Sequence, residues 1–371
     1  MKTVVITDAM YRSSVAAARL LGRSGYRVVL TQTRAECSLT PPSFDSRYAA
    51  ETRWIPGSVA DDDYPDKLFA ILSAYSRPVL LCIGADTLNT VSWQRERFRT
   101  VCDFYIAAPG ILDALNDKDT VYRRCQELHI AVPRRYEGIP QRYPVVVKPR
   151  CGERFGLKAK DRYIIADNLK EYRRAVSVMS KYDAAPLVQE KLTGAAIGVN
   201  LLMGRDGTVL DVFCHRRVRE YPVTGGPSSC CESIYSLDMI RPAQRLLRSF
   251  HFTGLAMVEF KGGCVLEVNP RIWGSFPLAE KCDSRILEHY VSAAQGKDDV
   301  SMDFFSPGFQ TGVKMRFLLN DSAAMWELLR HGKFSAFGEG IRDMFTAKEA
   351  LYARDDPAPM RRYLRNTLLH R

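Results

Sequence analysis

The order of apolar runs at the start of the chain constrains its fold more than any other feature. Residues 3–7 (TVVIT) and 26–32 (YRVVLTQ) are short apolar runs, and residues 13–25 between them (SSVAAARLLGRSG) have helical spacing. A further run at 78–86 (PVLLCIGAD) follows a second helical stretch. A strand, a helix and a strand of these lengths predict a β-α-β unit with parallel strands and a right-handed crossover.

The turn after the first apolar run, TDAMYRSS, contains no glycine. The dinucleotide fingerprint G-x-G-x-x-G needs glycines there so that the backbone can approach a pyrophosphate, and their absence argues against an NAD site. Asp8 and Asp86 each end a predicted strand, where open parallel sheets place their ligands. Each is therefore either a substrate contact or a loop cap.

The charge balance favours an anionic ligand. The chain has 371 residues, enough for two or three domains, and its 53 Lys and Arg against 42 Asp and Glu give a formal charge of +11. This excess does not choose among a nucleotide, a nucleic acid and a membrane surface. The basic residues are spread along the chain without the long block of a nucleic-acid tail, so we expect no nucleic-acid partner.

Two further features predict where the protein is found. No apolar run approaches the ~20 residues of a membrane span, and the N-terminal MKTVVITDAM lacks the apolar core of a signal peptide. The ten cysteines form no C-x-x-C pair, which argues against a thiolate metal site. We expect a cytoplasmic protein with reduced thiols and no contact with a membrane.

The segment 254–269 predicts two strands around a Gly-Gly turn, and polar residues alternate along the second strand. Successive side chains of a strand point to opposite faces, so Glu267 and Asn269 share a face that Arg271 can continue. Carboxylate and amide oxygens suit a hard cation such as Mg²⁺, and a guanidinium suits a phosphate. A sheet edge with solvated polar residues is the alternative.

A metal site shared by both strands requires Glu259 and Glu267 to lie on the same face of this hairpin. With a strict two-residue turn at Gly262-Gly263, Glu259 pairs with Leu266, and Glu259 and Glu267 then lie on opposite faces. Bringing the two acids together requires an extra loop residue or a β-bulge, for which glycine is suited. We predict this irregularity.

Four motifs follow one another along the chain, and their order indicates a function more specifically than any one motif alone. They are a lysine at the start of a helix, a lysine between a strand and a glycine-containing loop, a Gln-Glu pair that ends a strand, and the acidic hairpin. Their residues are Lys118; Lys148; Gln189 and Glu190; and Glu259, Glu267, Asn269 and Arg271. This set resembles the ATP-grasp family, and EVNPRIWGS (residues 267–275) is similar to its carboxylate–amine ligase branch.

The resemblance implies an α/β chain in which a Rossmann-like N-terminal domain precedes an α+β ATP-grasp fold with a lid subdomain. The expected division is 1–115 for the Rossmann-like domain, 116–190 for the lid, 191–296 for the metal and catalytic subdomain, and 297–371 for an extension packed on the core. In the extension we expect an irregular wrap with a helix or two.

The resemblance also implies a role for each motif residue. ATP would be bound by Lys118, Lys148, Arg217 and the adenine-lining segment Gln189, Glu190, Lys191 and Leu192. Mg²⁺, or Mn²⁺ in its place, would be held by Glu259, Glu267 and Asn269. The catalytic residues would be Arg271 and Arg219, with Arg217 and Arg219 on one face of a strand. The loop 151–160 would cover the site.

The implied reaction is an amide ligation through an acyl phosphate, in which a carboxylate attacks the γ-phosphate of ATP and an amine then displaces phosphate. Small carboxylic acids and amines, amino acids foremost, are the expected substrates. No protein nucleophile is needed, so the cysteines have no assigned role. We expect His215 and His251 to be structural and Trp273 to be a core residue, while the loop 222–233 forms either the acceptor side or a solvated surface.

Two departures from the family pattern bear on nucleotide binding: no acid for the ribose follows Gly194, and the lid loop carries Glu153 and Arg154 among few glycines. A carboxylase or carbamoyl-phosphate-type enzyme that uses bicarbonate would share every ATP contact. A nucleotide-binding module without turnover is a further alternative. A homodimer is left open, because one sequence does not fix the oligomeric state.

Overall fold

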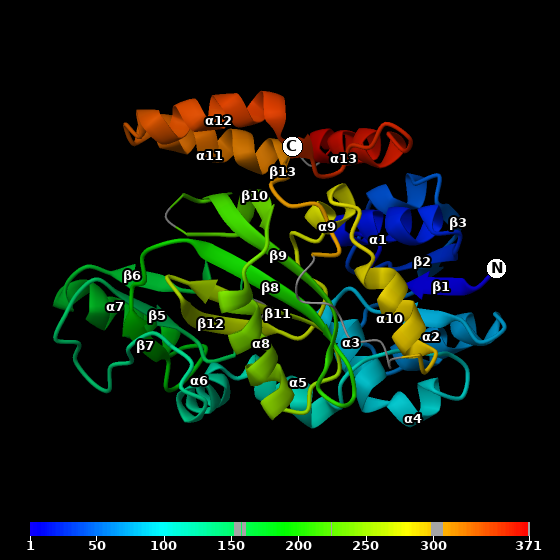
Figure 1. The fold of residues 1–371 in the computed structure, drawn as a ribbon, viewed down its shortest axis with the longest axis horizontal. Helices are drawn as coiled ribbons and strands as arrows, with labels where there is room; N and C mark the ends of the chain where they lie inside the picture. Colours follow the sequence, from blue (N-terminus) through cyan, green and yellow to red (C-terminus); the bar gives the residue numbers. More distant parts are fainter. Residues whose placement is uncertain (152–156, 158–160, 224, 298–306, 370–371) are drawn as a thin grey trace.

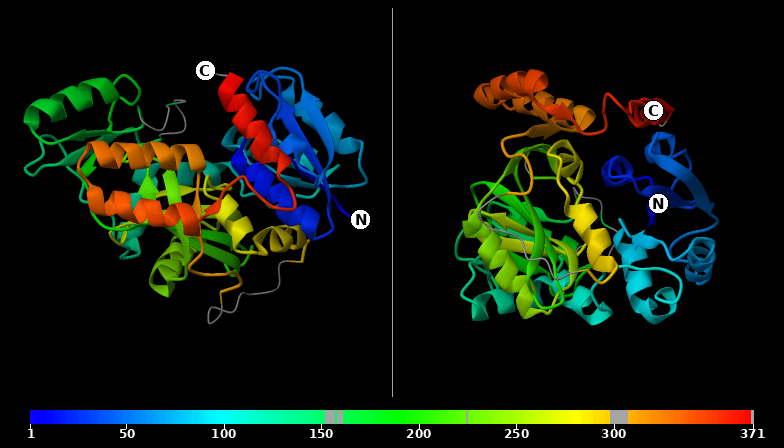
Figure 2. Two further views of the ribbon diagram at one scale, coloured as in Figure 1. Left: turned by 90° about the horizontal axis from the view of Figure 1, so that it is seen from above. Right: turned by 45° about the vertical axis from the view of Figure 1, so that its right-hand side comes forward.

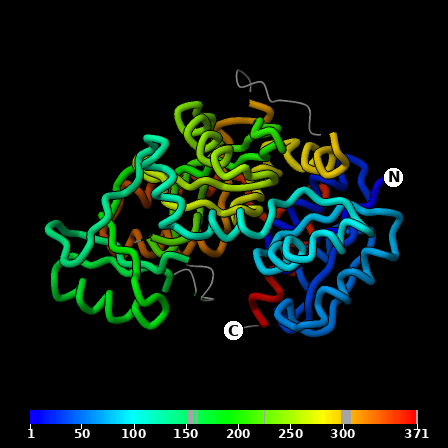
Figure 3. The backbone as a smooth tube through the Cα atoms, turned by 90° about the horizontal axis from the view of Figure 1, so that it is seen from below, coloured from blue at the N-terminus to red at the C-terminus, as the bar shows by residue number. Residues whose placement is uncertain are grey.

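The computed structural model describes residues 1–151, 157, 161–223, 225–297 and 307–369, which contain three sheets. A seven-stranded sheet occupies the middle of the molecule, a four-stranded sheet lies toward the N-terminus, and a three-stranded sheet lies at the opposite end (Figures 1 and 3). Glu153, Arg154 and most of the predicted lid loop lie outside the described residues.

The N-terminal sheet has the parallel β-α-β arrangement that the sequence predicts. Its strands follow the order β3-β2-β1-β4 and all pairs are parallel. The strands are β1 (Thr3–Ile6), β2 (Arg27–Thr33), β3 (Ala49–Ile55) and β4 (Val79–Leu81). The helices of this unit are α1 (Arg12–Arg23), η1 (a 3₁₀ turn, Pro42–Asp45), α2 (Tyr64–Ser73), α3 (Ala85–Trp93) and α4 (Arg95–Phe98).

Asp8, directly after β1, is a loop cap. Its carboxylate accepts hydrogen bonds from the backbone N–H of Gly84 at 2.8 Å and from the hydroxyl of Thr87 at 2.9 Å, at the start of α3. Burial raises the pKa of Asp8. Because its oxygens bind the protein's own donors, the structure favours the cap over a substrate contact.

The central sheet is antiparallel apart from its last pair, which is parallel. In the spatial order β12-β11-β8-β9-β10-β13-β14, it joins a β11–β12 hairpin, the three-stranded meander β8-β9-β10 and two short C-terminal strands. The strands are β8 (Ala196–Met203), β9 (Val209–Glu220), β10 (Ser228–Ile234), β11 (Gly254–Lys261), β12 (Cys264–Asn269), β13 (Lys314–Arg316) and β14 (Lys348–Glu349).

The three-stranded sheet forms a small unit with α7 and its own core. Val145 and Val147 pack with Ala166 and Met179, whereas Lys148 lies on the other face because side chains alternate along a strand. The unit contains β5 (Val145–Lys148), β6 (Ile164–Ala166), α7 (Leu169–Met179) and β7 (Leu187–Glu190). The other helices before the C-terminal region are α5 (Pro109–Asn116), α6 (Lys118–Glu127), α8 (Leu237–Ser249), α9 (Pro277–Lys281) and α10 (Ile286–Ala294).

The C-terminal region is more regular than predicted. The expectation of an irregular wrap with a helix or two is wrong, since the described part has three helices and two strands that extend the central sheet. The helices are α11 (Leu318–Arg330), α12 (Phe334–Thr346) and α13 (Ala358–Leu369). The chain finally returns to the N-terminal unit, where α13 lies beside η1 and α1 (Figure 2). The four-part division of the chain stays a proposal.

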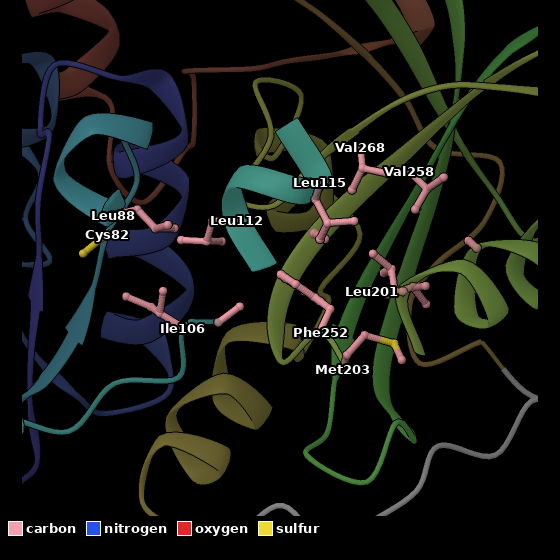
Figure 4. Packing of buried hydrophobic residues seen from close by; sticks show 14 of the residues in the cluster. Cys82, Leu88, Ile106, Leu112, Leu115, Leu201, Met203, Phe252, Val258 and Val268 are labelled. Carbon is pink, nitrogen blue, oxygen red and sulfur yellow. The ribbon is translucent and has the colours of Figure 1, made fainter. Parts of the chain in front are cut away.

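One continuous core joins the N-terminal unit to the central sheet. Figure 4 shows Leu112 of α5 near Leu88 of α3, and Leu115 one turn later near Val258 and Val268 of the central sheet. Because α5 is buried against both units, it fixes how they are oriented.

The longest described helices, α8, α11 and α12, have 13 residues each. No described helix combines the length and the apolar character that a membrane span requires.

A buried ion pair fastens the end of the chain to α1. The Arg19 guanidinium donates to the Asp356 carboxylate at 2.9 Å, and both side chains are almost fully buried. Asp356 also accepts hydrogen bonds from the hydroxyl of Ser46 at 2.7 Å and from the backbone N–H of Arg47 at 2.9 Å. One carboxylate thus joins three segments that are far apart in the sequence.

We expect Asp356→Ala to lower the free energy of unfolding by about 3–5 kcal/mol, because it leaves a buried guanidinium without its partner. Urea denaturation measures this loss. Asp66→Ala is the matched control, since its pair with Arg97 is largely exposed and contributes at most about 1 kcal/mol. Equal losses in both variants would contradict the anchoring role.

Candidate functional site

A cavity of about 350 Å³ opens between the three-stranded sheet and the central sheet. Its basic side chains are Lys118, Lys148, Arg162, Lys191, Arg217, Lys261 and Arg271, and its acidic ones are Glu220, Glu259 and Glu267. Further lining comes from Asn116, Val146, Tyr163, Ile165, Gln189, Leu192, Met257, Leu266, Val268, Asn269 and the glycines 225, 226 and 274. The excess of cations suits an anionic ligand.

Two carboxylates face each other across β11 and β12. Lys261 pairs with Cys264 around the Gly-Gly turn, yet Glu259 pairs with Glu267, because the register shifts after Phe260 and leaves Leu266 as an extra residue. The predicted irregularity is confirmed as a β-bulge in β12. Asn269 belongs to the same face, and its amide donates to Glu267 at 3.2 Å.

Two lysines approach these acids from other elements. The Asp117 carboxylate caps α6 by accepting from the Thr120 N–H at 2.9 Å, which makes Lys118 the first residue of the helix. Its ammonium lies 3.2 Å from the Glu267 carboxylate. Lys148 ends β5, and its ammonium lies 3.4 Å from the hydroxyl of Tyr122.

Burial and mutual charge set the titration of this cluster. Burial, helped by the neighbouring Lys118 ammonium, lowers the pKa of Lys148 to about 7. Burial alone would raise the pKa of Glu267, but the two lysine ammonium groups lower it to about 2. Burial raises the pKa of Glu259. The cavity therefore holds one firmly ionised acid beside a lysine that gives up its proton easily.

The structure separates the two arginines of β9. Arg217 lines the cavity and donates to Glu259 at 2.5 Å and to Glu220 at 3.3 Å. Arg219 is buried outside the cavity, where it binds Asp321 at 2.9 Å and Asp343 at 2.6 Å.

The prediction that these arginines share a face is wrong, and a second bulge explains why. Arg217 pairs with Cys231 and Arg219 pairs with Cys230. The two arginines are two residues apart on β9, whereas their partners are adjacent on β10, so β9 contains one extra residue. Neighbouring residues of β10 point to opposite faces, and the arginines opposite them do the same. Arg219 is thus an anchor for α11 and α12, and nothing places it near reacting atoms.

The segment that ends β7 only partly meets the prediction. Gln189, Lys191 and Leu192 line the cavity, and the Gln189 carboxamide oxygen accepts from the Tyr122 hydroxyl at 3.1 Å. Glu190 pairs with Val145, so its side chain lies on the opposite face of the sheet, where it accepts from the Arg134 N–H at 2.8 Å. The Glu190 side chain does not line the cavity.

The sequence did not predict the roles of two tyrosines, one that lines the cavity and one that contacts residues lining it. Tyr163 lies before β6, and its hydroxyl donates to the carbonyl of Gly225, so it connects the three-stranded sheet to the β9–β10 turn. A side chain at Gly225 would collide with this hydroxyl. Tyr122 joins α6, β7 and β12 through its hydroxyl. A tyrosine in a helix or loop carries no local signal of such a role.

Arg271 and Gly274, which follow β12, also line the cavity. The Arg271 guanidinium donates to the carbonyl of Ile272 at 2.9 Å. Trp273 is fully buried against Phe213 and Phe276, as predicted for a core residue.

The β9–β10 turn contributes to the cavity through Gly225, Gly226 and Pro227, but the polar residues after it do not. Ser229 donates to Asp321 at 3.2 Å, and Glu232 pairs with Arg216 at 2.5 Å.

A buried polar chain runs behind the carboxylates. The Asn200 amide lies 2.6 Å from the carbonyl of Phe213, so its nitrogen must face that oxygen, and the same nitrogen lies 3.2 Å from Nδ1 of His215. Nδ1 is therefore an acceptor, and Nε2–H donates to the Ser275 hydroxyl at 2.9 Å. Burial lowers the pKa of His215 to about 3. His215 is a neutral, structural histidine, as predicted.

Within the described residues, no three His, Cys, Asp or Glu side chains form a metal-binding group. The donor set at the bulge is instead two carboxylates and one carboxamide, Glu259, Glu267 and Asn269. This set suits Mg²⁺, which prefers few protein oxygens and completes its shell with water and phosphate.

No protein-family profile matches the chain, and no curated protein matches it in sequence. Solved structures do match. The biotin carboxylase from Campylobacter jejuni aligns over 84% of this chain and 74% of its own, at 12% identity and a TM-score of 0.63. The biotin carboxylase domain of 2-oxoglutarate carboxylase from Hydrogenobacter thermophilus aligns over 84% and 73%, at 12% identity and a TM-score of 0.62.

The L-amino acid ligase from Bacillus licheniformis aligns over 81% of this chain and 75% of its own, at 14% identity and a TM-score of 0.55. These proteins are ATP-grasp enzymes. The present chain has the ATP-grasp fold, which confirms the predicted fold class.

We expect Arg219→Met to lower the free energy of unfolding by about 3–5 kcal/mol, because Asp321 and Asp343 are then buried without their cation. Arg216→Met is the control on the same strand, since its pair with Glu232 is half exposed and contributes at most about 1 kcal/mol. Chemical denaturation of both variants makes the comparison. Similar losses in the two would show that Arg219 does not hold the helices.

The low pKa of His215 gives stability a dependence on pH. The unfolded histidine takes up its proton near pH 6.5, and the folded one only near pH 3, so the folded state loses stability as the pH falls between these values. This component amounts to at most about 1.4 kcal/mol per pH unit. We expect His215→Gln to remove it, as seen by comparing urea denaturation near neutral pH and near about pH 5. An unchanged difference between the two proteins at both pH values would contradict the neutral histidine.

Proposed function

We propose that this protein is an ATP-dependent carboxylate–amine ligase that forms an amide bond through an acyl phosphate. The observation that carries the proposal is the meeting of Glu259, Glu267, Asn269, Lys118 and Lys148 in one cavity, although four separate elements supply them. These residues favour a metal-bound polyphosphate as the ligand, because the carboxylates need a cation and the lysines need an anion.

The residues fit MgATP by an exchange of partners. Each carboxylate now pairs with a cation of the protein, Glu267 with Lys118 and Glu259 with Arg217. Phosphate oxygens would pair with those basic groups, and Mg²⁺ would be held by the carboxylates and Asn269. Every charged group of the site then still has a partner of opposite charge, which is necessary because an unpaired charge away from water is strongly unfavourable.

The nucleotide base would lie against the apolar part of the cavity lining. Val146 and Ile165 of the three-stranded sheet and Leu266 of β12 provide apolar walls there, and residues 189–192 provide the strand end. Backbone groups at the end of a strand can read the edge of an adenine. Lys191 and Leu192 fit this role, and Gln189 is held in place by Tyr122.

The chemistry requires stabilisation of charge more than a protein nucleophile. The substrate carboxylate forms a bond to the γ-phosphorus, and the bond from that phosphorus to ADP breaks. The amine nitrogen then attacks the acyl carbon, phosphate leaves, and the nitrogen loses a proton to solvent. Mg²⁺ would neutralise charge on the phosphates, and Arg271 and Lys148, which both line the cavity, would stabilise the transferred group.

The substrates are a small carboxylic acid and an amine, and amino acids are our first choice. The likeness to an L-amino acid ligase supports this choice. The likeness to biotin carboxylases supports a second candidate, in which bicarbonate is the acid. ADP release that requires bicarbonate and no organic acid would select the second.

We expect Glu267→Gln to reduce Mg²⁺-dependent ADP release by about 10²–10³, because one charge that holds the metal is lost. The assay is ADP release over a panel of amino acids and small acids. Glu127→Gln makes the same change on an exposed part of α6 and should act like the wild type. Wild-type protein that binds ATP but releases no ADP with any acid and amine would overturn the proposal.

A further inference from the structure

Helix α12 exposes a row of large apolar side chains at helical spacing. Phe334 is 68% exposed, Ile341 40%, Met344 46% and Phe345 86%. Residues 334, 341 and 345 lie one or two turns apart, so they form one stripe along the helix. A stripe of this kind on a soluble protein usually marks a contact surface.

The other face of α12 packs against the molecule, and its two buried residues are Gly340 and Asp343. Asp343 is buried there and accepts from Arg219 at 2.6 Å and from Lys314 at 2.8 Å. Gly340 lies against Met325 of α11, and a Cβ there would lie only 3.1 Å from the methionine side chain. Asp343 lies nine residues, two and a half turns, after Phe334, so the apolar stripe faces away from the buried acid.

The position of α12 in the molecule leaves this stripe accessible. Figures 1 and 2 show the α11–α12 pair side by side at the outer edge of the molecule, beyond β10 and β13.

We propose that two copies of this chain associate through α12, with the two helices antiparallel about a two-fold axis. An axis between Glu339 and Gly340 places Phe334 of one copy opposite Phe345 of the second copy. The same axis places Gly338 opposite Ile341 of the second copy. Both pairs occur twice, as a two-fold axis requires, so the stripe is complementary to itself.

The exposed glycine Gly338 is a second feature of α12 that supports a second copy as the partner. A glycine in the interior of a helix destabilises the helix relative to alanine. Gly340 is explained by its contact with Met325, but a side chain at Gly338 would meet nothing within 4 Å in the described chain. Ile341 of the second copy would occupy the space left by the missing side chain of Gly338.

The charged residues beside the apolar stripe are also complementary in this antiparallel pairing of the two helices. Glu339 and Arg342 lie on one flank of the stripe, both exposed, and neither has an ion pair among those found in the described residues. About the proposed axis, Glu339 of each copy lies within about 3 Å along the helix of Arg342 of the second copy. Two ion pairs then border the apolar contact. A helix that lay on a membrane would gain nothing from this central acid.

The test is the molar mass of the full chain in solution, from light scattering or sedimentation over a range of concentrations. A contact made mainly by one helix pair is small, so we expect a weak dimer that dissociates on dilution near about micromolar concentration. Phe345→Glu should raise the dimer Kd at least about 100-fold, because the new charge would be buried without a partner. Trp93→Glu, an equally drastic change at an exposed site of the N-terminal unit, should leave the Kd unchanged.

A charge exchange tests the geometry itself. Glu339→Arg and Arg342→Glu should each weaken the dimer, and the double variant should restore it, because opposite charges again face each other. A wild-type protein that is monomeric at all concentrations overturns the proposal, whether or not it binds lipid vesicles. So does a dimer that Phe345→Glu leaves intact, since another surface would then hold the copies together.

Discussion

The placement of two like charges opposite each other is the constraint on which the rest of the site depends. Glu259 and Glu267 are direct neighbours on adjacent strands, an arrangement that is unfavourable without compensation. Lys118 and Arg217 compensate for it at 3.2 Å and 2.5 Å. Because these cations come from α6 and β9, the carboxylate pair fixes how a helix start and a long strand must approach the β11–β12 hairpin.

Two β-bulges decide which residues reach the cavity. The extra residue Leu266 in β12 brings Glu267 to the face of Glu259, and the extra residue in β9 turns Arg219 away from the face of Arg217. A bulge shifts every later side chain of a strand to the other face. The first bulge was predictable because a metal site required it and a Gly-Gly turn allowed it. The second had no such requirement, and the simple alternation of side chains gave the wrong face for Arg219.

This contrast describes what the sequence can predict here. The β-α-β start and the β11–β12 hairpin follow from local patterns that strand and helix geometry make readable, whereas Lys118, Lys148 and Asn269 were assigned to the site through the resemblance to the ATP-grasp family. The contacts that could not be predicted join residues distant in the chain. Arg219 meets Asp321 across 102 positions, and Arg19 meets Asp356 across 337. Such pairs are set by packing of whole elements, which periodicity does not encode.

The same distant pairs connect the outermost helix to the cavity. Asp343 of α12 holds Arg219, and Arg217, two residues earlier on β9, holds Glu259. The apolar stripe of α12 and the carboxylate pair are therefore linked by two ion pairs and a short piece of one strand. Since the buried acid and the apolar stripe occupy opposite faces of α12, the inward face cannot turn outward without breaking the Arg219 network. The helix is held with its apolar side to solvent, and a second copy that covers this side would also hold the strand that carries Arg217.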